Sequence, residues 1–166
     1  EIPPIVAPGV LLDVATAKGR DCLEPGYAVS AEDLEECCLR QGVAVEPGSV
    51  VLVRTGNARH WDDPERYLAG PGVSAGASRW LAGGRPLAVG ADNMAWDVPG
   101  VKDPELGCNL PGHLILLARH GIYIIENLML EELAAAGVHR FRFVCTPLKL
   151  VGATGSPVRP LAVASW

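Results

Sequence analysis

Two histidines and one glutamate lie in the otherwise apolar run from Gly112 to Leu128, GHLILLARHGIYIIENL. Imidazole nitrogens and carboxylate oxygens bind borderline metal ions, and the same groups carry protons in general acid–base catalysis. A buried helix followed by a strand would give a similar apolar pattern without any chemistry. The positions of the three side chains within these elements decide between the two interpretations.

The pattern predicts a helix from about Leu114 to His120, stopped by Gly121, and then a strand that ends at Glu126. A helix antiparallel to the strand after it has its first turn beside the carboxyl end of that strand. His113 and Glu126 could therefore meet there, although a His–Glu pair at the ends of two elements is as often a plain surface contact. His120 lies about two turns from His113, roughly 10 Å along a regular helix, so the two histidines cannot share an ion. We expect His120 to cap carbonyls of the last turn.

Apolar runs alternate with short helical patterns along the chain, which predicts an α/β fold with a mixed or parallel sheet. The expected strands are 9–15, 49–56, 86–93, 122–126, 141–147 and 161–165, and the expected helices are 31–41, 75–81, 114–120, 130–137 and one starting at 64. Ser30, Asp63 and Ser74 are of the types that cap helices, and Ser30 with Asp33 resembles a capping box closed by Gly42.

Several predicted strands end in polar residues, namely Arg54 and Thr55, Asp92 and Asn93, and Glu126 and Asn127. Ligands of α/β folds tend to lie near the carboxyl ends of strands. Asp92 and Asn93 are therefore candidates to line a pocket. The alternative is that they only form the turn in which the strand reaches solvent.

Composition limits the classes of protein. With 49% hydrophobic and 20% charged residues, the 166-residue chain is globular in composition, and we expect one domain over residues 1–166. A net charge of -5 argues against nucleic acid or an anionic membrane as a partner, and no apolar run reaches the roughly 18 residues that span a bilayer. Five cysteines without a CxxC pair favour a reducing compartment, by default the cytoplasm.

Six segments, read in order, resemble the cyclase-like metal-dependent hydrolases, a family that includes bacterial kynurenine formamidase and isatin hydrolase. They are GVLLDVA, VVLVRTG, AVGADNMA, HLILLARHGIYIIENL, LEELAAAGV and PLKLVGATGSPVRPLA. The resemblance runs from about Pro8 to Ala164, and IIENL and GATGSPVRP are its most specific parts. It implies a swivelling α/β fold with a mixed, partly barrel-like sheet flanked by short helices. It also implies hydrolysis of an amide or lactam through a metal-bound water, with zinc or manganese.

On this resemblance, His113 and Glu126 match the family's C-terminal active-site histidine and glutamate. The pair would hold a second metal, as in formamidases, or act around the water and substrate as proton shuttle and supporting partner. The loop with Thr154 and Ser156 matches a family segment near the active site, where its small residues could receive a carboxylate or carbonyl; a plain turn is the alternative.

The family's principal metal motif, H-x-G-T-H-x-D-x-P-x-H, is absent, and His60 in RHWDDPE does not match it. We therefore expect the C-terminal portion of such a hydrolase, completed by an N-terminal segment that is a cleaved chain, a separate subunit or a further part of the same protein. Two ligands are fewer than the three that catalytic zinc usually takes from protein. We expect stable association with that segment, a small-molecule amide or lactam substrate, and a homo-oligomer of the completed unit.

Two other interpretations stay open. The chain could be a non-catalytic binding or scaffolding subunit that keeps the fold without the metal site. It could also be a stand-alone enzyme that uses His60, Cys108 and His113, although their spacing does not favour this.

Overall fold

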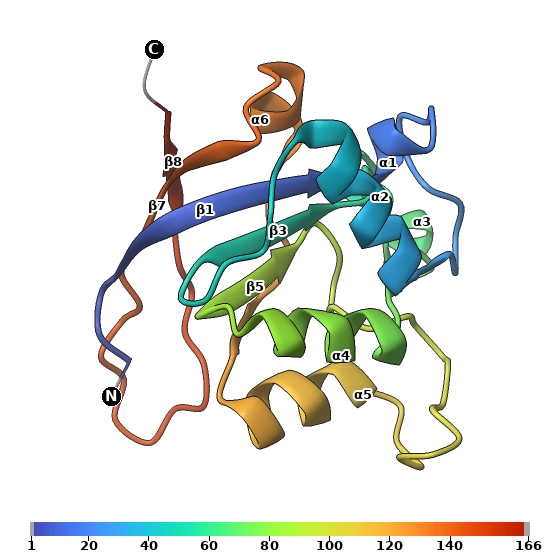
Figure 1. Cartoon of the computed structure of the whole chain (residues 1–166). Coiled ribbons are helices and arrows are strands. Elements are labelled where there is room, and N and C mark those ends of the chain that lie inside the picture. Colours follow the sequence, from blue (N-terminus) through green and yellow to red (C-terminus); the bar gives the residue numbers. More distant parts are fainter. Residues whose placement is uncertain (1, 165–166) are drawn as a thin grey trace.

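A six-stranded mixed sheet forms the centre of the molecule in the order β6-β5-β3-β1-β7-β8 (Figure 1), in a computed structural model that describes residues 2–164. The strands are β1 (Ile5–Asp13), β3 (Val50–Arg54), β5 (Ala88–Ala91), β6 (Tyr123–Ile125), β7 (Arg140–Cys145) and β8 (Leu161–Val163). The first four are parallel, β7 is antiparallel to β1, and β8 is antiparallel to β7. This confirms the predicted α/β class with a mixed sheet, and it brings the carboxyl ends of four strands to one edge.

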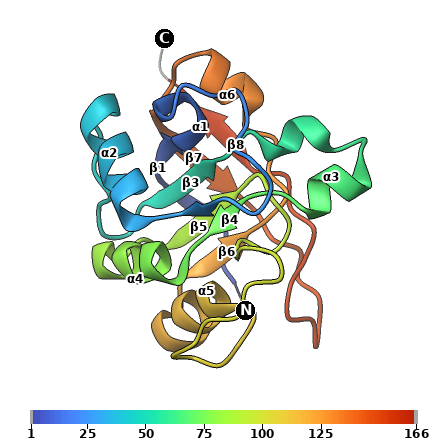
Figure 2. The ribbon, with the colours of Figure 1, turned by 90° about the vertical axis from the view of Figure 1, so that its right-hand side faces the viewer.

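Short helices cover the sheet. They are α1 (Val14–Ala17), α2 (Ala31–Gln41), the 3-10 helix η1 (Asn57–His60), α3 (Pro64–Leu68), α4 (Ala75–Gly84), α5 (Pro111–His113), the π-helix η2 (Leu114–Arg119) and α6 (Glu131–Ala135). Figure 2 shows α2, α4 and α5 along one side of the sheet. The larger core lies there and includes Leu12, Leu34, Leu81 and Leu116. A second core on the opposite face joins Leu11 and Phe143 to the segment that carries Leu128 and Leu130.

A second, two-stranded parallel sheet was not expected from the sequence. β2 (Ala28–Val29) pairs with β4 (Gly72–Val73), and Val73 also forms an isolated bridge to Asp97. Two-residue strands carry too little periodicity to be recognised in a sequence. The small sheet fixes the backbone of Asp97.

The predicted helix caps are confirmed. Ser30 and Asp33 form a reciprocal capping box at the start of α2, and Gly42 ends that helix in the left-handed region. The side chain of Asp63 accepts from Arg66 N at the start of α3, and Ser74 accepts from Ala77 N at the start of α4.

Strand β1 begins at Ile5, earlier than the predicted Gly9, and it ends at Asp13. Residues 5–8 pair only with β7, because pairing with β3 starts at Gly9. Pro8, which has no N–H, is tolerated there because β1 has a neighbour on only one side. At the other end of the chain, β8 confirms the last predicted strand as far as Val163, and Ser165 lies outside the described residues.

The helix predicted over 114–120 is present but is not a regular α-helix. Its first turn is α5, and residues 114–119 form the π-helix η2. The predicted separation of about two turns between His113 and His120 assumed a regular helix. The predicted cap is confirmed, because His120 Nδ1 donates to Ile115 O at 2.8 Å. Within residues 2–164 no helix is both long enough and apolar enough to cross a membrane.

Candidate active site

His113 and Glu126 meet beside the carboxyl end of β6, as the order of helix and strand predicts. Nε2 of His113 lies 3.2 Å from Oε1 of Glu126. The side chains are 27% and 31% exposed, so the pair is held by the fold and still reachable from solvent. The pair thus brings one possible nitrogen ligand and one possible oxygen ligand of a metal together.

The other ring nitrogen of His113 contacts Asp97, a residue that the sequence did not point to. His113 Nδ1 lies 2.9 Å from Oδ2 of Asp97, whose side chain is 1% exposed. The same carboxylate accepts the backbone N–H of Gly112 at 2.6 Å and that of His113 at 3.3 Å. His113 therefore lies between two carboxylates, one buried and one partly exposed.

The backbone around Asp97 has an unusual conformation. Ala95 and Trp96, directly before it, have φ values of 70° and 58°, a region that residues with a Cβ rarely adopt. The fully buried Trp96 is anchored through Nε1, which donates to Ser78 Oγ at 3.0 Å, and through its carbonyl, which accepts from Val73 N at 2.8 Å. Backbone strain of this kind persists only where the surroundings enforce it.

Gly112 is the one signal in the sequence for this contact. A Cβ at position 112 would lie 2.5 Å from Trp96 Cδ1 and 2.8 Å from Asp97 Oδ1. Glycine is required because the backbone of α5 packs directly against the Asp97 carboxylate.

The hydrogen bond to Asp97, followed by that to Glu126, raises the pKa of His113 to about 9 from its usual 6.5, and partial burial opposes the shift. The isolated chain therefore holds an imidazolium between its carboxylates at neutral pH. A metal at Nε2 would have to displace that proton, because imidazole binds metals in its neutral form.

Asp92, at the end of β5, is completely buried. Its carboxylate accepts from Thr55 N, from Gly56 N at 2.7 Å and from the Thr55 hydroxyl at 2.7 Å. Burial raises the pKa of Asp92, and the hydrogen bonds from Thr55 and Gly56 oppose that shift. In the described residues this side chain ties the ends of β3 and β5 together.

Asn93 lies next to it and is buried as well. Its Nδ2 donates to Pro71 O at 2.9 Å and to Trp96 O at 3.1 Å, whereas Oδ1 has no partner among the described residues. A buried amide oxygen without a donor is uncommon, so this atom is a place where a ligand could be received.

Tyr67 approaches the same edge from α3. Its hydroxyl donates to Asn127 Oδ1 at 2.7 Å, and its ring meets Trp61 edge-on with 5.3 Å between centroids. Burial, followed by the charges of Asp92 and Glu126, raises the pKa of Tyr67 to about 12. Asn127, directly after Glu126, has a φ of 57°, a left-handed conformation that asparagine tolerates, and the tyrosine holds its side chain.

Thr154 and Ser156 lie in the exposed connection between β7 and β8. Ser156 Oγ accepts from Leu148 N at 3.1 Å and donates to Pro157 O at 3.1 Å. The serine hydroxyl thus closes its own loop. No contact joins this loop to His113 or Glu126 in the hydrogen bonds of residues 2–164.

The donor types at this edge fit a metal, but their number is incomplete. His113 Nε2 and Glu126 suit zinc or manganese, and Asp97 holds the far ring nitrogen as carboxylates do behind metal-bound histidines. No group of three or more His, Cys, Asp or Glu side chains within residues 2–164 could hold a metal. The pair fits as part of a site to which further ligands are added.

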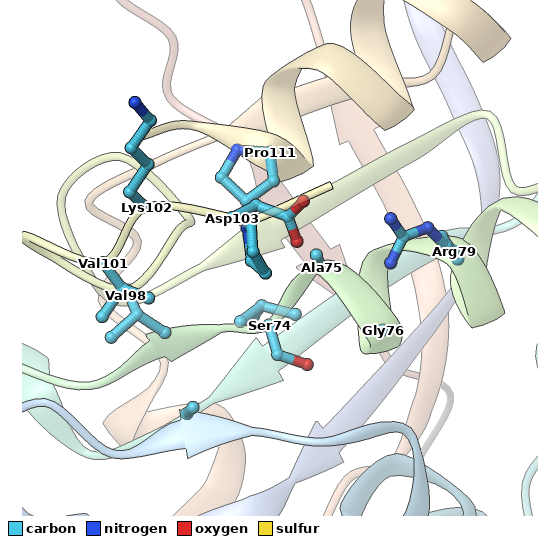
Figure 3. Close-up of a pocket in the computed structure, with 12 residues that line it drawn as sticks. Ser74, Ala75, Gly76, Arg79, Val98, Val101, Lys102, Asp103 and Pro111 are labelled. Atoms are coloured by element: carbon cyan, nitrogen blue, oxygen red, sulfur yellow. The ribbon is translucent and has the colours of Figure 1, made fainter. Parts of the chain in front are cut away.

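A cavity of about 280 Å³ lies at the start of α4. Figure 3 labels Arg79 of α4, Asp103 of the loop between β5 and α5, Val98 and Pro111 among the residues that line it. Those last two residues adjoin Asp97 and Gly112 in the chain, but His113 and Glu126 do not line the cavity.

The model of the Cyclase family, described as "Putative cyclase", matches residues 1–98. A kynurenine formamidase from Polaromonas naphthalenivorans (strain CJ2) is 30% identical over 134 aligned residues, a match that covers 75% of this chain and 54% of that protein. The chain spans about half the length of the curated relatives that it matches.

Solved structures share the fold. One described as a novel cyclase is 33% identical with a TM-score of 0.79, and the match covers 95% of this chain and 53% of that one. Isatin hydrolase A from Ralstonia solanacearum is 25% identical with a TM-score of 0.78, over 96% and 61% of the two chains. A potential metal-dependent hydrolase with cyclase activity is 25% identical with a TM-score of 0.67, over 94% and 64%. The chain belongs to the Cyclase family.

Proposed function

We propose that this chain supplies the His113–Glu126 part of a metal-dependent hydrolase that cleaves the C–N bond of an amide or lactam, and that it acts together with a complementary N-terminal segment. The observation that carries the proposal is the 3.2 Å approach of His113 Nε2 to Glu126 Oε1 at the carboxyl end of a parallel strand. The similarity to a kynurenine formamidase and to isatin hydrolase A supports the reaction class.

His113 Nε2 and Glu126 would hold the metal, or would stand beside it, while the remaining ligands come from the complementary segment. A bound zinc or manganese supplies a water of lowered pKa and polarises the scissile carbonyl. Which of the two metals the completed site takes is left open by the donor types, since imidazole and carboxylate suit both.

The chain's own groups account for binding and proton movement. Where the pair stands beside the metal, the Glu126 carboxylate would accept a proton at Oε1, and the protonated His113 imidazole would carry one toward the leaving nitrogen. Tyr67 orients Asn127 beside them. Asn93, with its unpartnered Oδ1, is the first candidate for substrate contact, and Asp92, Thr154 and Ser156 are the other predicted ones.

The proposal extends to the assembly. Residues 1–166 would form one domain of the completed enzyme, which would be a homo-oligomer in the cytoplasm and would take small amides or lactams. Association with the complementary segment is expected to be stable. Val6 on β1, and Leu161 and Val163 on β8 at the edge of the sheet, are each more than half exposed.

Intact-mass spectrometry of the natively purified protein tests the partner first. A second species that carries the H-x-G-T-H-x-D-x-P-x-H segment would support the proposal. Hydrolysis of isatin and of an N-formylated aromatic amine is then measured in the complex, with zinc or manganese added, for His113→Ala and Glu126→Gln. Both are expected to lose at least about 100-fold in kcat/KM, and His139→Asn, outside the site, serves as control. A chain that works alone as a binding subunit would show no second species and no turnover.

A further inference from the structure

We propose that Asp97 is the positioning residue of this site: its carboxylate fixes the proton of His113 on Nδ1 and thereby presents Nε2 toward Glu126. This inference deepens the proposed function. It rests on that function only for the role of Nε2, which is to bind the metal or to move a proton. The arrangement of Asp97 itself stands on the contacts of the described residues.

The first support is the direction of the hydrogen bonds. Both oxygens of Asp97 accept protein N–H groups, Oδ1 from Gly112 and Oδ2 from the backbone of His113. The ring atom Nδ1 lies 2.9 Å from the same Oδ2. Because a carboxylate oxygen accepts, Nδ1 is the donor, and the lone pair of the neutral ring is left on Nε2.

The second support is how firmly Asp97 is placed. The side chain is 1% exposed, and the backbone before it is held in the left-handed region at Ala95 and Trp96. Trp96 is fixed by its bond to Ser78, and β4 pairs with this segment through Val73. A surface turn would not need such support.

The third support is Gly112. Any Cβ there would collide with Trp96 and with Asp97 Oδ1. The helix start is therefore shaped to let the carboxylate bind two successive backbone N–H groups and the imidazole at once. An exposed histidine with a chance ion pair requires none of these features.

Asp97→Asn separates positioning from packing, because it keeps the size of the side chain. The amide oxygen would stay on the short bond from Gly112 N, so the NH₂ group would face His113 Nδ1. Nδ1 could then no longer donate, and the neutral ring would carry its proton on Nε2. Asp97→Ala removes the acceptor altogether.

The experiment is ¹H–¹⁵N NMR of the histidine side chains in the natively purified protein, with its partner where one co-purifies. Spectra are recorded at a pH at which the ring of His113 is neutral, because both nitrogens carry a proton in the imidazolium. We expect a slowly exchanging proton on His113 Nδ1 in the wild type and in the control Asp103→Asn, a carboxylate of the same segment that does not contact His113. The signal should be lost in Asp97→Asn and Asp97→Ala. Gly112→Ala should also weaken it, although the carboxylate remains.

Persistence of the Nδ1 proton in folded Asp97→Ala, or its absence from the wild type, would overturn the proposal. If neither Asp97 variant folds, the wild-type signal and Gly112→Ala decide. Zinc affinity of the complex gives a second readout, expected to fall about 10- to 100-fold in Asp97→Asn and to stay unchanged in Asp103→Asn. A complex that binds neither zinc nor manganese would refute the proposed metal chemistry, whereas the NMR result would still decide the role of Asp97.

Discussion

Nε2 of His113 lies 3.2 Å from Oε1 of Glu126. His113 lies near the start of the helix formed by α5 and η2, and Glu126 directly follows β6, the next strand. The contact is a consequence of topology. After η2 the chain reverses into β6, which is parallel to β5, and the carboxyl end of β6 lies beside the start of α5. Glu126 is therefore placed by the sheet, and His113 by the helix that packs against it. This makes the pair a rigid feature on which titration and mutation should report directly.

The pKa of His113 should be close to 9 when it is followed by NMR in the isolated chain. Removing the charge of one partner should lower it, and Asp97→Asn should lower it further than Glu126→Gln, since the bond to Asp97 is the larger cause of the shift. Asp103→Asn is the matched control and should leave it unchanged. A His113 that titrates near 6.5 in the folded wild type would contradict the arrangement of carboxylates around it.

The same shift predicts how stability depends on pH. Because the folded pKa of about 9 lies above the unfolded value near 6.5, His113 contributes its full stabilisation below about pH 6.5 and loses it as the pH rises through 9. Urea unfolding of the wild type and of His113→Gln should give free energies whose difference shrinks between pH 6.5 and pH 9. A difference that stays constant over this range would show that the imidazolium is not stabilised by the fold.

The strands that carry the site could be predicted from the sequence, whereas the residue that orients His113 could not. Apolar runs located β3, β5 and β6, and the helix before β6 implied that His113 and Glu126 meet. Asp97 depends on left-handed conformations at Ala95 and Trp96, where the residue types argue against such a backbone. Tertiary contacts of the buried indole and of the Trp96 carbonyl hold that conformation.

The π-helix η2 was missed for a related reason. Its apolar residues fit a period of 3.6 as well as any short run can, and Pro111 and Gly121 mark the ends of either kind of helix. Ile115 and Leu116 of η2 are buried in the core, and η2 packs against α4. Sequence alone fixes that a helix is present, but not how many residues each turn contains.

Thr55→Val should destabilise the protein by about 1–3 kcal/mol, because it removes a 2.7 Å hydrogen bond to a carboxylate that water cannot reach. Thr16→Val removes a bond of the same length, from Thr16 Oγ1 to Asp13 Oδ2, at an exposed residue. It should cost less, because Asp13 is also buried but keeps the charged guanidinium of Arg54 as a donor at 2.7 Å. Chemical denaturation measures both, and equal losses would mean that the buried Thr55 hydroxyl contributes no more to stability than a hydroxyl at an exposed residue.

Arg54→Met should cost about 3–5 kcal/mol, since it leaves a buried carboxylate without its cation. The guanidinium side chain is 4% exposed; it contacts Asp13 at 2.7 Å and Glu131 at 2.9 Å. Burial disfavours its charged form, but the bonds to Glu131 and Asp13 outweigh that effect and raise its pKa. Arg59 binds the same Glu131 at 2.8 Å with its side chain 48% exposed.

Arg59→Met is therefore the matched control, because it removes the same charge and the same partner from a solvated position. Its cost should stay below about 1 kcal/mol, as for other exposed ion pairs. Because Glu131 begins α6, loss of Arg54 should also release that helix from the ends of β1 and β3, and amide hydrogen exchange should rise there first. Similar unfolding energies for the two variants would show that Arg54 is dispensable and that packing alone holds α6 in place.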